Sequence, residues 1–328
     1  MERKLASIQT IRHLEPAENS DNLAIASVLN WEVLVRNGEF NIGDKIVFFE
    51  PDAFLPIRPE FEFLRKSNFK TMRDEVTGEN VEGFRIKTIK LRGNLSQGLV
   101  FDAKVFGMEN YDIDTDVTEE LGVKKWELPL PDSQEIEGLF PDFVPKTSCT
   151  RFQTLKSHQY AHKLFWMTEK IDGTSGTLAE YNGEFYLASR NFLVKPGANK
   201  YSFAVNNYRL YEVIPENTAI QYEVYGPGIQ GNPLRVQKLS IAVFSMFDII
   251  SQTYWDLGKV AFFCKNNNVP MVPTEMKKQY TLYEQDWMKF VDGQHSSINS
   301  EQLLEGFVFH SDDLRIKFIS RAYDAKRA

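Results

Sequence analysis

The chain has 328 residues, 42% of them hydrophobic and 25% charged, which is typical of a globular protein with a buried core and one or two domains. Its formal net charge of −7 argues against non-specific nucleic-acid binding but allows a local basic groove. No apolar run approaches the roughly 20 residues of a membrane span, and the N-terminus lacks the apolar core of a signal peptide, so we expect a cytoplasmic protein outside the membrane.

The first 110 residues predict a series of short strands, in which β-branched and aromatic residues alternate with polar ones. These strands are Leu23–Val28, Trp31–Val35, Lys45–Phe49, Gly83–Leu91 and Gly98–Phe101. Turn signals such as Asn37-Gly38 and Arg92-Gly93-Asn94 separate them. Five or six such strands favour a small β-barrel, and the OB-fold is the commonest barrel of this kind that handles nucleic acid. We therefore predict an OB-fold domain over residues 1–110.

The next stretch, residues 111–150, is acidic and rich in proline, and predicts a loosely packed linker with one short helix at most. A second domain, residues 151–328, is predicted to open with a helix and to contain two more, at Tyr254–Asn267 and Leu282–Phe290. Its predicted strands are Lys163–Ile171, Thr177–Tyr181, Glu184–Ser189, Ala219–Tyr225, Ser240–Ile250, Gly306–His310 and Asp313–Ile319. This mixture predicts an α+β domain with an antiparallel sheet.

The segment Glu169-Lys170-Ile171-Asp172-Gly173-Thr174-Ser175-Gly176 lies at the end of a predicted strand, where the chain turns through two glycines. A lysine at this position can project into a cleft, with Asp172 beside it. Lysine attacks phosphorus only as the neutral amine, so its pKa must fall or a nearby cation must disfavour the ammonium. By itself, such a short pattern marks a surface turn more often than a catalytic site.

Further motifs follow Lys170 in order along the second domain. They are Ser189-Arg190-Asn191, Glu223 before Gly226-Pro227-Gly228-Ile229-Gln230, Phe247-Asp248, Glu305-Gly306-Phe307-Val308 and Arg315-Ile316-Lys317. Their order and residue types resemble the nucleotidyl-transfer motifs of the covalent nucleotidyltransferase superfamily, which contains DNA ligases, RNA ligases and mRNA capping enzymes. One such motif is weak evidence, whereas an ordered set across the whole domain is strong evidence.

The finer resemblance is to RNA ligases. Thr174 and Ser175 follow Gly173, where DNA ligases and capping enzymes usually have an arginine two residues after the glycine. The Gly226–Gln230 run resembles the corresponding segment of phage and editing-type RNA ligases. Asp172, the β-rich N-terminal region and the Lys87–Leu99 segment resemble the Naegleria-type ATP-dependent RNA ligases, which have an N-terminal OB domain. Eleven residues follow Lys317, whereas DNA ligases and capping enzymes place an OB domain after this motif, so the order also favours an RNA ligase.

This resemblance implies an α+β protein with an OB-like barrel followed by a nucleotidyltransferase domain built on an ATP-grasp-like antiparallel sheet. It implies an ATP-dependent enzyme that joins 3′-OH and 5′-phosphate RNA ends, at nicks in duplex RNA, through a lysyl-AMP and an AppRNA intermediate. The cofactors implied are ATP and a divalent metal, Mg²⁺ or Mn²⁺. No obligate protein partner is evident.

The resemblance also implies a role for each motif. Lys170 is the nucleophile on the α-phosphorus of ATP, with Asp172 beside it, and Lys317 stabilises charge on the α-phosphate. Glu305 and Glu223 place the metal through water. The remaining nucleotide contacts come from Thr168, Glu169, Arg190, Glu223, Phe247, Lys146, Arg151 and Arg315. The backbone at 168–169 and the Phe247 ring hold adenine, Glu223 holds the ribose, and Lys146 and Arg151 hold the outer phosphates. Arg190 holds the ribose or, later, the RNA 5′-phosphate, and Arg315 serves either catalysis or RNA binding.

A second group of residues is predicted to bind RNA. Its members are Lys87, Lys90 and Arg92, near Phe84 and Phe101, together with Thr174 and Ser175. Basic and aromatic side chains together suit a surface that binds a nucleic-acid strand, although exposed lysines on a β-edge also serve to deter aggregation.

Three other functions remain open: a GTP-dependent capping guanylyltransferase, a DNA ligase, and a non-catalytic nucleic-acid-binding protein with the same fold. Fold by itself does not separate them. Cys149 and Cys264 are the two cysteines, and we expect them to be reduced thiols. We expect no structural zinc, because no Cys/His cluster has zinc-ligand spacing.

Overall fold

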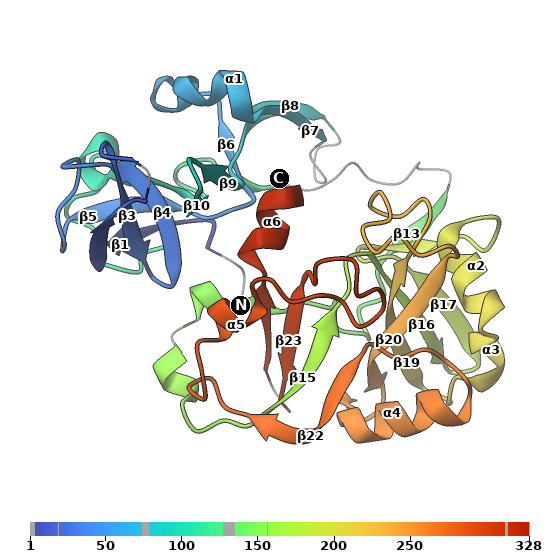
Figure 1. The fold of residues 1–328 in the computed structure, drawn as a ribbon. Coiled ribbons are helices and arrows are strands. Elements are labelled where there is room, and N and C mark those ends of the chain that lie inside the picture. Colours follow the sequence, from blue (N-terminus) through green and yellow to red (C-terminus); the bar gives the residue numbers. More distant parts are fainter. Residues whose placement is uncertain are drawn as a thin grey trace. The chain divides into compact units, whose positions relative to one another are not determined.

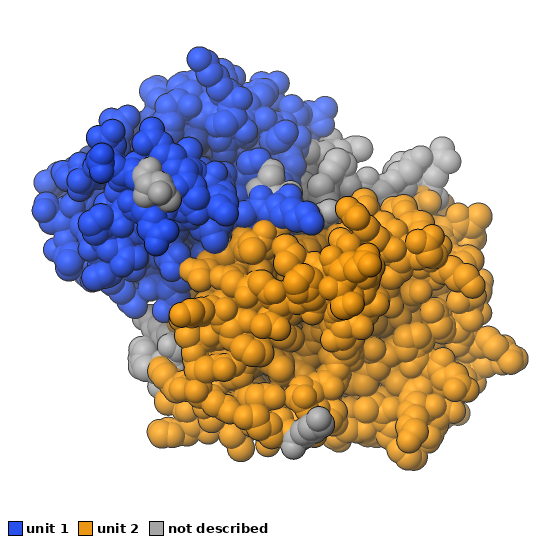
Figure 2. Space-filling model, in the orientation of Figure 1, with its two compact units in different colours: residues 1–130, 324–328 blue, residues 131–323 orange. Residues whose placement is uncertain are grey.

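The computed structural model describes residues 4–18, 20–73, 79–126, 135–155, 157–311 and 314–327. The chain divides into two compact units, coloured separately in Figure 2: unit 1 comprises residues 1–130 and 324–328, and unit 2 comprises residues 131–323. Strands dominate both units and helices are short (Figure 1), which confirms the predicted α+β class. No helix within the described ranges has the length and apolar character needed to cross a bilayer.

Unit 1 is built from four small sheets in the described residues. Their strand orders are β1 (Ala6–Thr10)–β5 (Lys45–Phe49)–β11 (Leu99–Asp102); β2 (His13–Pro16)–β3 (Leu23–Val28)–β4 (Trp31–Arg36); β10 (Asn94–Gln97)–β9 (Thr88–Leu91); and β12 (Lys124–Lys125)–β6 (Ala53–Pro56)–β8 (Asn80–Arg85)–β7 (Phe69–Arg73). The helical elements are η1 (Pro59–Leu64), α1 (Arg65–Asn68) and η2 (Ala103–Phe106).

Strand β5 joins the two apolar clusters of unit 1. Successive side chains of a strand point to opposite faces, and β5 is buried on both. Ile46 and Phe48 pack with β3 and β4 around Trp31, whereas Val47 and Phe49 pack with β1 and β6. The predicted strands Leu23–Val28 and Lys45–Phe49 are confirmed. The predicted strand Gly83–Leu91 is in fact two strands, because β8 ends at Arg85 and β9 begins at Thr88.

The two compact units divide within the predicted linker. Val117, Leu121 and Val123 are buried in the core of unit 1, and Asp116 bridges to Ser7 of β1. Further along, β13 (Ile136–Leu139) pairs with a strand of unit 2, and Val144 is buried there. Most of the acidic residues, Asp112, Asp116, Glu119 and Glu120, lie at exposed positions among these apolar residues, so composition alone did not reveal the packing. The domain boundaries at residues 110 and 150 stay a prediction.

Unit 2 contains two mainly antiparallel sheets in its described part. One has the order β13–β18 (Phe192–Val194)–β17 (Glu184–Ala188)–β16 (Thr174–Tyr181)–β19 (Thr218–Tyr225)–β20 (Ser240–Asp248)–β21 (Thr253–Tyr254); the other has the order β14 (Thr150–Arg151)–β24 (Arg315–Ile319)–β23 (Gly306–His310)–β15 (Phe165–Lys170)–β22 (Thr274–Tyr280). We call them the seven-stranded and the five-stranded sheet. The helical elements are η4 (Phe152–Thr154), η5 (Ser157–Tyr160), α2 (Lys200–Asn207), α3 (Leu210–Val213), α4 (Leu257–Asn266) and α5 (Trp287–Val291). Helix α6 (Arg321–Arg327) begins in unit 2, and its residues from 324 on belong to unit 1.

Each sheet has one apolar face that packs against helices. Helices α2, α3 and α4 cover the face of the seven-stranded sheet that carries Ile220, Tyr222 and Val224 (Figure 1). On the five-stranded sheet, Phe165 and Ile316 pack with Trp287 of α5. Because side chains alternate along a strand, the neighbouring residues of β15, β19 and β24 point to the opposite, more polar faces. These faces carry most of the motif residues.

The five-stranded sheet and its approach differ from the sequence prediction at two places. The helix predicted at the start of the second domain is wrong: two short 3₁₀ helices, η4 and η5, follow the two-residue strand β14. Strand β22 was not predicted, because its sequence Thr-Glu-Met-Lys-Lys-Gln-Tyr lacks alternating apolar residues. It is an edge strand, and pairing with β15 on one side is enough to hold it without two buried faces.

Candidate active site

Lys170 is the last residue of β15, and its Nζ lies 2.9 Å from Oε1 and 3.1 Å from Oε2 of Glu305. The register of the sheet makes this contact, because Lys170 pairs with Gly306, the residue after Glu305. The two residues are 135 positions apart in the sequence. Their side chains are 26% and 15% exposed, so the ion pair is largely withdrawn from water.

Glycines beside Lys170 allow this close approach. A Cβ on Gly306 would lie 2.0 Å from the carbonyl oxygen of Phe318, and one on Gly173 would lie 2.3 Å from that of Val224. Neither distance is physically possible for a side-chain carbon, so both positions require glycine in this fold. The motif glycines therefore keep β23 against β24 and the turn after Lys170 against β19.

Glu223 is the second carboxylate near Lys170, and it comes from the seven-stranded sheet. It pairs with Ser175 across β16 and β19, and its side chain lies opposite the helix-covered face. Its pKa is raised to about 8, chiefly by burial and further by the charges of Glu305 and Asp172, against the opposing effects of Lys170 and Arg190. The pKa of Glu305 is also raised, chiefly by burial and further by the charge of Asp172, against the opposing effects of Lys170 and Lys317.

The pKa of Lys170 itself lies above its ordinary value of 10.5. Burial has the largest single effect and lowers it, but the carboxylates of Glu305 and Glu223 together raise it by more. In this ligand-free arrangement Lys170 is therefore an ammonium ion. The raised pKa of Lys170 differs from the lowered pKa that a nucleophilic amine needs. The groups that keep it raised are the carboxylates of Glu305 and Glu223.

Lys317 and Arg315 lie on the same face of the five-stranded sheet as Lys170. Lys317 pairs with Val308 of β23 and with Arg151 of β14, and its charge lowers the pKa of Glu305, against the larger, raising effect of burial. Arg315 donates a hydrogen bond of 2.8 Å to Oγ of Ser245 on β20, and its guanidinium lies 3.8 Å from the ring centre of Tyr254. The Arg315–Ser245 bond shows that the polar faces of the two sheets meet.

The residues predicted to contact the adenine edge, Thr168 and Glu169, lie in β15, the strand that ends at Lys170. Thr168 is 2% exposed, and its hydroxyl lies 2.8 Å from Nε2 of His310. The carboxylate of Glu169 accepts hydrogen bonds from the hydroxyl of Ser296 and, at 2.9 Å, from the N–H of Ser297. The sequence did not single out His310 or Ser296, because neither belongs to a motif. His310 contacts Thr168 and Ser296 contacts Glu169, so both hold the side chains of the two residues that precede Lys170.

His310 should make the stability of the protein depend on acid. Burial, and to a lesser extent the charge of Arg315, lowers its pKa from an ordinary 6.5 to about 3. Between these pH values the unfolded chain binds a proton that the folded protein does not, so stability is lost as the pH falls. Urea unfolding of His310→Gln should show a slope of stability against pH that is smaller by up to about 1.4 kcal/mol per pH unit between pH 6 and 4. Above pH 7.5 the two curves should run parallel; identical slopes in acid would contradict the assignment.

Phe247, predicted to stack on adenine, is 3% exposed. Its ring packs edge-to-face on Tyr254 at 5.0 Å, in an apolar cluster with Val144, Ala179 and Ala219. Its role in adenine binding stays a prediction. Phe244, which the sequence analysis did not single out, is half-buried and packs against the cluster that contains Ile171, the residue after Lys170. A β-bulge between Gln221 and Tyr222 disturbs the register of β19 and β20 beside it.

The remaining predicted residues fall into two groups. In unit 2, Thr174 and Ser175 engage Tyr201 and Thr147 through hydroxyl contacts of 3.1 and 3.2 Å. The side chains of Lys146 and Arg190 are exposed, and that of Arg151 is 9% exposed. In unit 1, Lys90 and Arg92 are exposed on the β9–β10 hairpin, Lys87 is half-buried before it, Phe84 is fully buried and Phe101 is half-buried. The structure brings together Lys170, Glu223 and Glu305, and places Lys317 on the same sheet face.

Comparison with known proteins gives two matching family models and several similar structures. A model described as an OB-fold domain matches residues 5–103, and one described as RNA ligase matches residues 163–322. Solved structures of a Naegleria gruberi RNA ligase mutant with AMP and Mn, and of the ligase with PPi, are each 29% identical, cover 99% of both chains and have a TM-score of 0.86. Another mutant with ATP and Mn is 28% identical, covers 99% of this chain and 98% of that chain, and has a TM-score of 0.84. No curated protein matches the chain.

Proposed function

The chain belongs to the RNA ligase family, and from this premise we propose that it joins RNA 3′-OH and 5′-phosphate ends through an AMP carried on Lys170. One observation carries the proposal: Lys170 stands at the end of β15 in contact with Glu305, beside Glu223 and on the same sheet face as Lys317. This arrangement provides a nucleophile, carboxylates and a second cation for charge on phosphate.

The proposed reaction has three steps. The neutral amine of Lys170 attacks the α-phosphorus of ATP, forms the phosphoramidate bond and releases pyrophosphate. AMP then passes to the 5′-phosphate of the RNA, which regenerates the lysine and gives AppRNA. Finally, the 3′-OH attacks the 5′-phosphate, AMP leaves and a phosphodiester bond forms. In each step the protein contributes positioning and stabilisation of charge, because phosphoryl transfer requires the reacting groups in line.

The first step requires Lys170 to lose a proton. Burial already lowers its pKa, and the carboxylates of Glu305 and Glu223 counteract burial. Any change that neutralises these carboxylates therefore leaves the lowering effect of burial on the pKa of Lys170 unopposed, and so favours the neutral amine. Lys317 adds positive charge near Glu305 and acts in the same direction.

The carboxylates suit a divalent metal bound through water. Glu223 and Glu305 provide oxygen ligands, which Mg²⁺ and Mn²⁺ prefer. Burial is the largest cause of their raised pKa values and disfavours their charged forms, which a bound cation would favour. Within the described ranges no three His, Cys, Asp or Glu side chains are grouped as a direct metal site. A hydrated cation bound there would neutralise both carboxylates and the charge of the ATP phosphates.

The other motif residues are proposed to hold the nucleotide. The backbone at Thr168 and Glu169 reads the adenine edge and Phe247 stacks on it; Glu223 and Arg190 contact the ribose. Lys317 contacts the α-phosphate, with Arg315 beside it on β24. Lys146 and Arg151 contact the outer phosphates, and Arg151 is supported by its pairing with Lys317.

The substrate is proposed to be nicked duplex RNA in the cytoplasm, bound without an obligate protein partner. Lys87, Lys90 and Arg92 are proposed to contact its strands. Lys90 and Arg92 are exposed on the β9–β10 hairpin, where phosphate contacts are sterically possible. Thr174 and Ser175 are proposed to contact RNA from the start of β16, next to Lys170. The predicted division into an OB-fold domain over 1–110, a linker and a catalytic domain over 151–328 is retained as part of this proposal.

Covalent labelling followed by sealing assays tests the function. The protein is incubated with α-labelled ATP or α-labelled GTP and Mg²⁺ or Mn²⁺, and we expect label on the protein from ATP alone. It is then given nicked RNA duplexes, nicked DNA duplexes and single-stranded RNA, and we expect sealing chiefly of the nicked RNA. Label from GTP would indicate a capping guanylyltransferase, efficient sealing of nicked DNA would indicate a DNA ligase, and absence of label would indicate a binding protein.

A further inference from the structure

Tyr323, near the C-terminus, contacts the lysine motif directly. Its phenol donates a hydrogen bond of 2.6 Å to Oδ2 of Asp172, a residue 151 positions earlier. The Tyr323 side chain is 8% exposed. An O–H···O⁻ bond of this length is among the stronger hydrogen bonds in proteins, because the acceptor carries charge. Asp172 lies two residues after Lys170 and one before Gly173, in the turn between β15 and β16.

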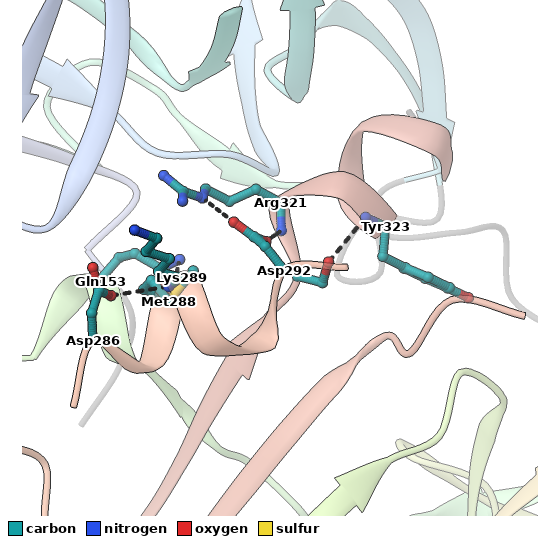
Figure 3. A network of polar contacts seen from close by, with 8 residues as sticks. Gln153, Asp286, Met288, Lys289, Asp292, Arg321 and Tyr323 are labelled. Carbon is teal, nitrogen blue, oxygen red and sulfur yellow. Dashed lines mark hydrogen bonds and ion pairs between the residues drawn. The ribbon is translucent and has the colours of Figure 1, made fainter. Parts of the chain in front are cut away.

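The chain around Tyr323 is fixed at several points, so its phenol is held in a defined place. At the start of α6, the N–H and Nε of Arg321 donate to the two carboxylate oxygens of Asp292, each at 2.7 Å (Figure 3). Asp292 caps the C-terminal end of α5. Ser320, 1% exposed, accepts a 3.3 Å hydrogen bond from the N–H of Tyr323 and donates its own N–H to the carbonyl of Glu305 at 2.9 Å.

These contacts link Tyr323 to both sides of the Lys170–Glu305 pair. The backbone of Glu305 bonds to Ser320, three residues before the tyrosine, and the phenol reaches Asp172, two residues after the lysine. The charge of Asp172 acts on the site: after burial, it is among the causes that raise the pKa values of Glu305 and Glu223. The hydrogen bond from Tyr323 therefore fixes the position of the Asp172 carboxylate, in the turn that follows Lys170.

We propose that Tyr323 is a positioning residue for the adenylation of Lys170, which acts by fixing the Asp172 carboxylate through its phenolic hydrogen bond. This inference rests on the proposed function of Lys170. It assigns a role to a residue outside the motif series, because Tyr323 lies after the last motif, Arg315-Ile316-Lys317.

Tyr323→Phe removes the hydroxyl and keeps the ring, and Tyr111→Phe is the matched control. The phenol of Tyr111 also donates to a carboxylate, Oε1 of Glu120 at 2.9 Å, in unit 1. The measurement is the rate and the final extent of labelling by α-labelled ATP over a range of ATP concentrations. For Tyr323→Phe we expect a maximal rate about tenfold lower, with the half-maximal ATP concentration and the final labelled fraction unchanged. The control should match the wild type.

The final labelled fraction separates positioning from folding, because misfolded protein lowers the extent of labelling and leaves the rate of the remainder unchanged. That pattern, or a rate equal to that of the control, would overturn the proposal. Asp172→Ala provides the second measurement, because alanine has no oxygen to accept the phenol: in that background Tyr323→Phe should cause no further loss, whereas another tenfold loss would exclude action through Asp172. If the wild type itself takes no label, the proposed function fails first and the inference falls with it.

Discussion

Lys170→Arg should carry no covalent AMP, although it keeps the positive charge beside Glu305. Arginine remains protonated at any accessible pH and cannot provide the lone pair that attacks phosphorus. Lys170→Ala should be equally inactive, because both variants lack the amine that forms the phosphoramidate. We expect labelling by α-labelled ATP to fall below about one ten-thousandth of the wild-type rate in each.

The two variants together separate the loss of the nucleophilic amine from the loss of the positive charge. Arginine can retain the ion pair with Glu305, so its unfolding midpoint should lie closer to that of the wild type than the midpoint of the alanine variant, which leaves two largely buried carboxylates without their cation. Lys265→Ala, at an exposed position on α4, is the control and should label normally. Label on either Lys170 variant would place the covalent bond elsewhere and remove the basis of the proposed function.

Lys317→Ala should slow the adenylation of Lys170 by about 100- to 1000-fold, as removal of a charge-stabilising group commonly does. Ile316 and Phe318 are buried in the core beneath the five-stranded sheet, so β24 has little freedom to turn Lys317 away from its polar face. The measurement is the single-turnover rate of labelling at saturating ATP.

Two further variants define what Lys317 contributes. Lys317→Arg keeps the charge with a different shape and should recover part of the rate. Lys278→Ala removes a lysine from the edge strand β22 of the same sheet, where the side chain is exposed and paired with Glu284, and should have no effect. A labelling rate for Lys317→Ala within about tenfold of the wild type would mean that Lys317 does not stabilise charge in this step.

Local sequence patterns predicted much of the fold. Gly306–His310 forms β23 as predicted, and Leu23–Val28 forms β3, because alternation or apolar runs report directly on which face a strand buries. The OB-fold region followed by a ligase domain is confirmed by the matching family models and structures. Short or edge elements escaped prediction: α2 is eight residues long, and it is capped by the Asn199 side chain rather than marked by a long amphipathic repeat.

The lysine motif shows what the sequence determined and what required the tertiary structure. The sequence identified Lys170 as the candidate nucleophile from residue types within a few positions and from the order of the later motifs. The ion pair with Glu305, the raised pKa values of both carboxylates and the phenol of Tyr323 on Asp172 were decided by the fold. Each motif can be recognised from a few neighbouring residues, whereas charge interactions depend on the distance and burial of residues far apart in the sequence, such as Lys170 and Glu305, which are 135 positions apart. Those distances are fixed by strand register and by the packing of the two sheets, which a local pattern does not contain.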